Sequence, residues 1–190
     1  MTYKLRPNQV IKKLGGRIIY LVGMMGSGKS TTGPHLAKLL KYSFIDQDEL
    51  IEKVAKSSVS QIFREEGENG FRDIETQVLK QIGQRHSLVV ATGGGLVTRS
   101  ENWGVLHQGI VIWLDPNREL LFARLKSDKT VVRPLLDNKD PKDVLDSLIK
   151  QRYLSYAEAD LHISIERETP EEVALVIFKK LSEIIRVQED

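Results

Sequence analysis

The strongest constraint in this sequence is a glycine-rich segment that lies between a strand-like run and a helix-like run. Residues 23–30 read GMMGSGKS, which fits the pattern G-x-x-x-x-G-K-[ST]; RIIYLV precedes them and TTGPHLAKLLK follows. Glycines at these positions let backbone N–H groups turn inward around phosphate oxygens, and the helix that follows presents the positive end of its dipole. The segment therefore predicts a phosphate-binding loop at the carboxyl end of a buried strand.

The last two residues of this loop indicate a nucleoside triphosphate rather than a generic anion. Lys29 would lie between the β- and γ-phosphates, and the Ser30 hydroxyl would coordinate Mg²⁺. The alternative is a glycine-rich turn whose lysine is solvated. The loop alone does not separate ATPases, GTPases and kinases. The residues predicted to bind the nucleotide here are Gly23, Gly26, Ser27, Gly28, Lys29, Ser30 and Thr31.

Short apolar runs alternate with helical patterns along the whole chain. Because these runs are nearly continuous rather than alternating, they are typical of parallel strands covered on both faces. We therefore predict an α/β fold with three αβα layers and a five-stranded parallel sheet. The expected strands are residues 17–22, 42–45, 88–91, 109–114 and 161–165.

Helix starts are suggested by capping residues. Thr98 with Glu101 would form a capping box, and Thr169-Pro170 and Asp140-Pro141 each put a capping side chain before a proline. The charged segment 126–140 contains Pro134 and is the best candidate for a mobile lid.

Composition fits a single catalytic domain spanning residues 1–190, with 41% hydrophobic and 28% charged residues. The formal net charge of +2 gives no reason to expect a nucleic-acid or membrane partner, and the apolar runs are shorter than the roughly 20 residues of a membrane span. Cysteine is absent, which suits a reducing compartment. Residues 1–16 are basic and are interpreted as a short leader. Cytoplasm is the default, with a plastid stroma after processing left open.

Two acidic residues, Asp46 and Asp48, follow the second expected strand and so lie at the carboxyl edge of the sheet, beside the phosphate loop. One carboxylate would belong to the magnesium shell, and the other would accept a hydroxyl proton from the phosphoryl acceptor. The alternative is that Asp48 simply caps the helix that begins DELIEKVAK.

A second signature lies on the next expected helix. Residues 67–75 read GENGFRDIE, in which Arg72 and Glu75 are three residues apart and would face the same side. A guanidinium held by a carboxylate can grip a substrate carboxylate through two parallel hydrogen bonds. An arbitrary pair of this kind would be a weak surface ion pair. The stretch, however, resembles the G-E-x-x-F-R-x-x-E signature of shikimate kinases.

Three more segments carry the same resemblance. Residues 92–95 read TGGG after a buried strand, residues 133–136 read RPLL, and residues 151–153 read QRY. Successive glycines allow close approach of a ligand to the backbone, although they also suit a plain turn. The arginines of the other two segments would be solvated in an arbitrary protein. In shikimate kinases the corresponding segments are the acceptor loop, the lid and the source of a second substrate-binding arginine.

The resemblance extends from about residue 18 to the last helix, and its implications are specific. It implies strand order 2-3-1-4-5, an acceptor-binding region at about 48–85, a lid at about 126–140 and a monomer. The implied reaction transfers the γ-phosphoryl of ATP to the 3-hydroxyl of shikimate, with Mg²⁺. Lys29, Asp48 and Arg133 would be catalytic. Asp46, acting through water, and Ser30 would hold the metal.

The remaining roles follow residue by residue. The residues implied to bind shikimate are Asp48, Arg72, Gly93, Gly94, Gly95 and Arg152, with Glu75 in support. Arg133 would cover the phosphates, and Lys126, Arg167 and Pro170 are the candidates beside the adenine. The alternatives are a gluconate or nucleoside-monophosphate kinase, which would lack the F-R-x-x-E and T-G-G-G elements, and a binding module that has lost activity.

Overall fold

The computed structural model describes residues 7–127 and 141–187, and its centre is one parallel sheet. The strands are β1 (Ile19–Val22), β2 (Ser43–Asp46), β3 (Leu88–Ala91), β4 (Ile110–Pro116) and β5 (Leu161–Ile165). Their order is β2-β3-β1-β4-β5, and every neighbouring pair is parallel. Fold class and strand order are therefore confirmed. Strands β2 and β3 lie on one side of β1, and β4 and β5 lie on the other. The carboxyl end of β1 is therefore a topological switch point, where such sheets bind ligands.

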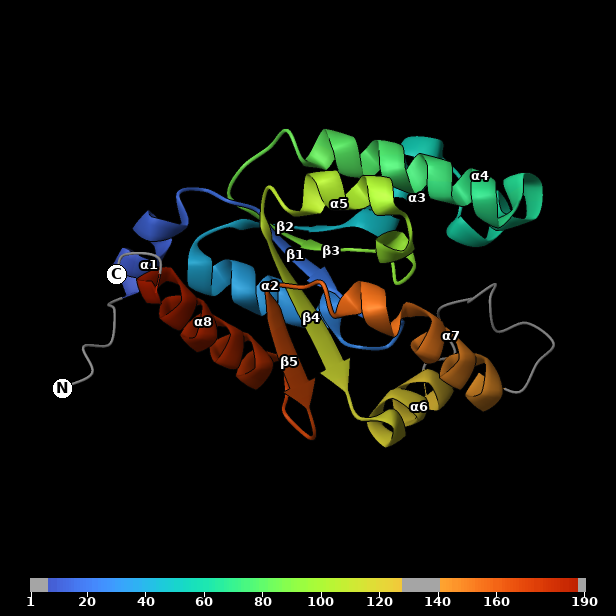
Figure 1. Ribbon diagram of the computed structural model, residues 1–190. Coiled ribbons are helices and arrows are strands. Elements are labelled where there is room, and N and C mark those ends of the chain that lie inside the picture. Colours follow the sequence, from blue (N-terminus) through green and yellow to red (C-terminus); the bar gives the residue numbers. More distant parts are fainter. Residues whose placement is uncertain (1–6, 128–140, 188–190) are drawn as a thin grey trace.

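Helices cover both faces of the sheet (Figure 1). One face carries α1 (Pro7–Leu14), α2 (Lys29–Leu40) and α8 (Pro170–Val187). The other carries α4 (Val59–Ile82), α5 (Ser100–Leu106), α6 (Arg118–Ser127) and α7 (Pro141–Tyr156). The short α3 (Gln47–Ala55) packs against α4, and the 3-10 turn η1 (Leu96–Thr98) follows β3.

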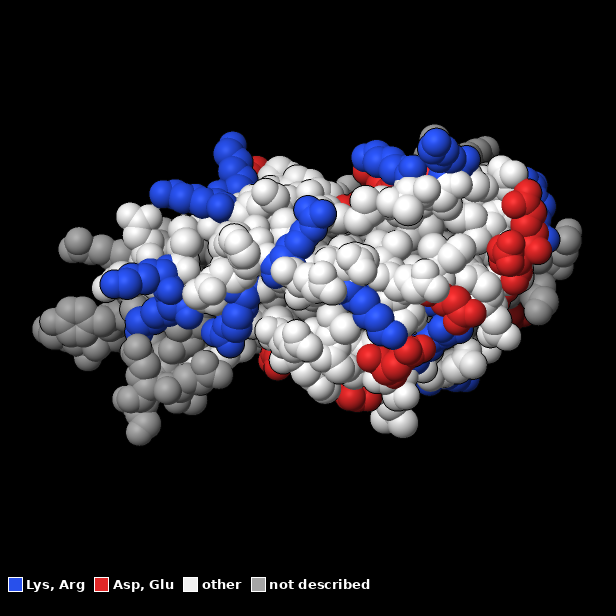
Figure 2. All heavy atoms as spheres, turned by 90° about the horizontal axis from the view of Figure 1, so that it is seen from above, with Lys and Arg blue, Asp and Glu red and all other residues white. Residues whose placement is uncertain are grey.

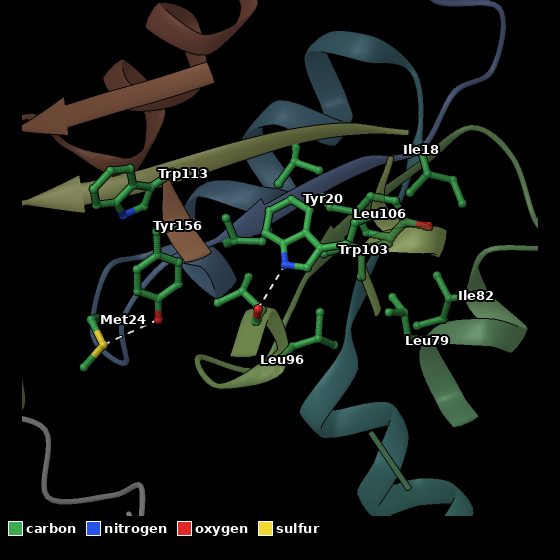
Figure 3. Close-up of a cluster of buried hydrophobic side chains, with 14 of the residues drawn as sticks. Ile18, Tyr20, Met24, Leu79, Ile82, Leu96, Trp103, Leu106, Trp113 and Tyr156 are labelled. Atoms are coloured by element: carbon green, nitrogen blue, oxygen red, sulfur yellow. Dashed lines mark hydrogen bonds between the residues drawn. The ribbon is translucent and has the colours of Figure 1, made fainter. Parts of the chain in front are cut away.

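The alternation of side chains along β1 joins the two hydrophobic layers. Ile19 and Leu21 belong to the layer under α2 and α8, whereas Tyr20 and Val22 belong to the layer under α4 and α5. Figure 3 shows this second layer, in which the indole N–H of Trp103 donates to the backbone oxygen of Val97 at 3.0 Å. Because β1 is buried on both faces, the loop that follows it begins from a rigid position.

The edge strand β5 differs from the expectation that all strands are covered on both faces. Ile163 and Ile165 are buried against α8, but His162 and Ser164 on the opposite face are exposed. An edge strand has one neighbouring strand, so helices on the α7 side do not reach across it. Its alternating pattern, LHISI, reports this one-sided burial.

The start of the chain also differs from a simple leader. Residues 7–14 form α1, and Val10 and Leu14, four residues apart and thus on one helical face, are fully buried against the α2/α8 layer.

The helix caps agree with the sequence prediction at one helix start and differ from it at another. Thr169 and Glu172 form a reciprocal capping box at the start of α8. Thr98 instead donates its hydroxyl to Gly95, so the predicted Thr98–Glu101 box is wrong.

Charge is unevenly spread over the surface. Seen from above, acidic side chains gather toward one end of the molecule, whereas basic side chains lie at both ends (Figure 2). The small net charge of +2 is thus a sum over regions of different sign. No helix in the described residues is long and apolar enough to cross a membrane.

Candidate active site

The phosphate loop connects β1 to α2 as predicted. Gly28 is the N-cap of α2 with φ 94°, a left-handed conformation that favours glycine, and the N–H of Thr32 bonds its carbonyl oxygen at 2.8 Å. Lys29 is buried, and its ammonium donates to the carbonyl oxygens of Gly23 and Met24 at 2.8 and 2.9 Å. The lysine therefore lies along the loop rather than in solvent.

Electrostatics keep Lys29 cationic despite its burial. Burial lowers the pKa of Lys29 to about 8, while the carboxylates of Asp48 and Asp46 raise it. Both carboxylates come from the end of β2 and the first turn of α3, which the sheet brings next to the loop. The lysine and the two acids thus form one charged cluster at the carboxyl edge.

Asp46 joins this cluster to the start of α2. The Ser30 hydroxyl donates to Asp46 Oδ2 at 2.5 Å, and Asp46 Oδ1 accepts from the backbone N–H groups of Asp48 and Glu49. Asp46 is therefore the N-cap of α3, and Asp48 lies inside the first turn instead of capping it. The capping alternative for Asp48 was wrong by two residues.

The Ser30 and Asp46 pair fits a magnesium ion. Both side chains offer oxygen atoms, which Mg²⁺ prefers, and the ion is commonly bound by one or two such groups together with substrate phosphates. No group of three or more His, Cys, Asp or Glu side chains within residues 7–127 and 141–187 is placed to hold a metal ion. A magnesium ion at this site would complete its shell with phosphate oxygens and water molecules.

Asp48 occupies an unusual environment. Burial raises its pKa to about 6; Glu75 and Asp46 add to this increase, and Lys29 and Arg72 oppose it. Its Oδ1 is buried and has no hydrogen-bond partner among the described residues. A carboxylate with spare acceptor capacity beside a phosphate loop can orient a hydroxyl group or take its proton.

The Arg72 and Glu75 pair is buried in the wall of the site. Arg72 Nη1 donates to Glu75 Oε2 at 2.7 Å, with the two residues 7% and 0% exposed. Burial raises the pKa of Glu75, and Arg72 opposes that increase. Glu68, which the sequence reasoning did not single out, accepts from Arg72 Nη2 at 3.2 Å. A weak surface ion pair is therefore excluded.

The glycines after β3 make room for these side chains. A Cβ on Gly93 would overlap the Glu75 carboxylate, and a Cβ on Gly95 would overlap the Arg72 guanidinium. Thr92 ties the start of this loop to β1, because its hydroxyl donates to Leu21 O at 3.0 Å. The TGGG segment thus serves close packing against charged groups as well as turning the chain.

Arg152 reaches the same glycine loop from α7. It is 4% exposed, and its Nη1 lies 3.6 Å from the point where a Cβ on Gly94 would be. Its charge acts on Lys29, Glu75 and Tyr156. The structure therefore brings Arg72 and Arg152, which are far apart in sequence, to the same glycine loop.

One cation near the phosphate loop was missed by the sequence reasoning. Arg124 on α6 donates to Gly26 O at 3.3 Å, whereas Lys126, which is predicted to lie beside the adenine, is exposed. A usable signal was present: Leu121 and Leu125 are the buried residues of α6, and Arg124 lies next to them on the helix. Burial lowers the pKa of Arg124.

The remaining adenine and lid residues are less constrained. Arg167 is exposed and Pro170 partly exposed where β5 turns into α8, at the carboxyl edge of the sheet. Arg133 and residues 128–140 lie outside the described residues. Their assignments stay predictions.

Comparison with known proteins decides the family. The family model for shikimate kinase matches residues 25–182. The chain belongs to the shikimate kinase family. The shikimate kinase of Prochlorococcus marinus strain MIT 9211 is 61% identical over 93% of this chain and 88% of its own length. That of Nostoc punctiforme is 49% identical over 92% of this chain and 96% of its own.

Solved structures agree with this family. The shikimate kinase of Acinetobacter baumannii in complex with shikimate has a TM-score of 0.86 and 38% identity, covering 92% of this chain and 98% of its own. A gluconokinase from Sinorhizobium meliloti has a TM-score of 0.58 and 13% identity, covering 92% of this chain and 98% of its own. The second likeness shows the fold alone, so the gluconate-type alternative gains no support from it.

Proposed function

We propose that this chain catalyses transfer of the γ-phosphoryl group of ATP to the 3-hydroxyl of shikimate, giving shikimate 3-phosphate and ADP, a step of chorismate and aromatic amino-acid biosynthesis. The observation that carries the proposal is the pair of buried guanidinium groups, Arg72 and Arg152, beside the glycine loop. Buried arginines suit a carboxylate-bearing acceptor, because each can donate to its oxygens and neutralise its charge.

Nucleotide binding is assigned to the phosphate loop. Backbone N–H groups of residues 23–31 and the Lys29 ammonium would bind the β- and γ-phosphates, with Arg124 reinforcing the loop from α6. Ser30 and Asp46 would hold Mg²⁺, which neutralises phosphate charge when bound. Arg133, Lys126, Arg167 and Pro170 retain the phosphate and adenine roles that the family resemblance implies.

The acceptor would be held by charges on three elements. Arg72 and Arg152 bind its carboxylate, Glu75 fixes Arg72, and Gly93, Gly94 and Gly95 line its pocket. Asp48 orients the attacking hydroxyl and accepts its proton as the new phosphate ester forms. Because phosphoryl transfer needs little covalent chemistry from the protein, this positioning and charge neutralisation account for most of the catalysis.

We propose that the chain acts as a monomer in the cytoplasm and forms a single catalytic domain. All five strands form one sheet, and the two large hydrophobic layers share β1, which supports one cooperative unit. The relatives named above are bacterial, which favours the cytoplasm over a plastid.

The test is ADP release from MgATP with shikimate as the acceptor, compared with gluconate and with nucleoside monophosphates. Arg72→Ala and Asp48→Asn should each lose shikimate-dependent turnover. Arg64→Ala, which removes an exposed arginine from the same helix as Arg72, is the matched control and should keep it. Turnover with gluconate but not shikimate would overturn the acceptor, and MgATP binding without turnover on any acceptor would favour an inactive binding module.

A further inference from the structure

Tyr156, the last residue of α7, lies where three parts of the site meet. It is 2% exposed, and its hydroxyl donates to the carbonyl oxygen of Gly94 at 2.5 Å. The same hydroxyl lies 3.5 Å from the sulfur of Met24 in the phosphate loop, a contact visible in Figure 3. The Tyr156 side chain therefore contacts both the glycine loop after β3 and the phosphate loop.

Arg152 is the third part of the site that Tyr156 meets. Arg152 lies one helical turn before Tyr156 on α7, so the two side chains share a helical face. Burial, the larger effect, raises the pKa of Tyr156 to about 12, and the nearby Arg152 guanidinium opposes that increase. The hydroxyl thus stays protonated at neutral pH and remains a donor to Gly94.

Gly94 also lies close to the phosphate loop. A Cβ at Gly94 would lie 3.3 Å from the backbone nitrogen of Met25 and 3.5 Å from Gly23 O, both in the phosphate loop. The same point is 3.6 Å from Arg152 Nη1. Fixing the Gly94 peptide therefore fixes the spacing between nucleotide and acceptor, on which in-line transfer depends.

We propose that Tyr156 is a positioning residue, which holds the acceptor glycine loop, the phosphate loop and Arg152 in register for phosphoryl transfer. This inference rests on the proposed function. It assigns to α7 a part beyond supplying Arg152: the helix end locks the Gly94 peptide through one hydroxyl. Because the Tyr156 ring also stacks on Trp113, with ring centroids 5.7 Å apart, loss of the hydroxyl leaves most of the packing in place.

Tyr156→Phe removes only the hydroxyl oxygen and is the direct test. The Gly94 carbonyl and the Arg152 guanidinium would each lose a partner in a buried setting, so KM for shikimate should rise about tenfold. KM for ATP should change by no more than about twofold, because the nucleotide contacts the phosphate loop backbone. Tyr153→Phe, which alters a half-exposed tyrosine of the same helix, is the matched control and should match the wild type.

A double-mutant cycle separates positioning from mere stability. If Tyr156 acts through Arg152, the effects of Tyr156→Phe and Arg152→Lys on KM for shikimate should sum to clearly more than the effect of the double variant. Unchanged KM and kcat in Tyr156→Phe would overturn the role of Tyr156 alone. Equal losses toward both substrates that follow a lower melting temperature would also overturn it. A wild type inactive with shikimate would overturn the proposed function and this inference with it.

Discussion

The phosphate loop takes its contacts from residues 23–31, which are consecutive in the chain, whereas the acceptor side assembles single charged side chains from α3, α4 and α7 around the loop after β3. The phosphate loop binds its ligand mainly through backbone groups, and the acceptor side mainly through side chains. A binding site made of backbone groups needs only glycines and a helix start. A binding site made of side chains needs burial, charge pairing and space, all of which depend on packing.

Lys29→Met tests the nucleotide side and has the largest expected effect. Lys29 is the only lysine in residues 23–31. Loss of its ammonium group should lower turnover with shikimate by roughly a thousandfold. The readout is ADP release at saturating MgATP. Lys38→Met, an exposed lysine on the same helix, should leave it intact. A loss of less than tenfold would show that backbone N–H groups carry the nucleotide side without the lysine.

Gly95→Ala perturbs the acceptor side without removing a charged group. The backbone φ of −100° suits alanine, but the added Cβ would overlap the Arg72 guanidinium. The value of kcat/KM for shikimate should therefore fall roughly a hundredfold, while ATP binding is retained. Gly104→Ala, where nothing lies within 4 Å, is the control. Equal loss of ATP binding would mean that the two sides are not separable.

Arg124→Ala sharpens the border between the two sides. It removes the α6 contact to Gly26 and should raise KM for ATP about fivefold, with KM for shikimate unchanged. Arg118→Ala, which removes an exposed arginine from the same helix, is the matched comparison and should have little effect. The reverse result would assign the Arg124 contact to packing.

The melting temperature of Asp48→Asn tests the energetic cost of the acceptor side, and its change by a few degrees is the smallest of the four expected effects. Because burial raises the pKa of Asp48 to about 6, its ionised form destabilises the fold above that pH, and the cost disappears below about pH 4. Without nucleotide and in EDTA, the variant should melt a few degrees higher at pH 8, about 2–4 °C for each kcal/mol, and equally at pH 4. Glu49→Gln, an exposed neighbour, should show no such difference. A variant less stable than wild type at pH 8 would contradict the raised pKa.

The sequence predicted much of the site because several of its signals are local. The Arg72 and Glu75 spacing on a helix was sufficient to predict their contact, and the tandem glycines marked a place of close approach. It did not single out Arg124, whose contact with the phosphate loop depends on which face of α6 is buried. The alternative that Asp48 caps α3 was wrong, because the cap is Asp46.

By itself, then, the sequence determined the phosphate loop, the parallel sheet and the identity of most charged residues at the site. These features rest on backbone conformation and on short-range spacing, which act within a few residues. Only the tertiary structure decided that α1 belongs to the core, that burial raises the pKa of Asp48 and that Tyr156 links both loops with Arg152. Burial and electrostatic coupling arise between elements far apart in the chain, so they exist only once the sheet and its helices have packed.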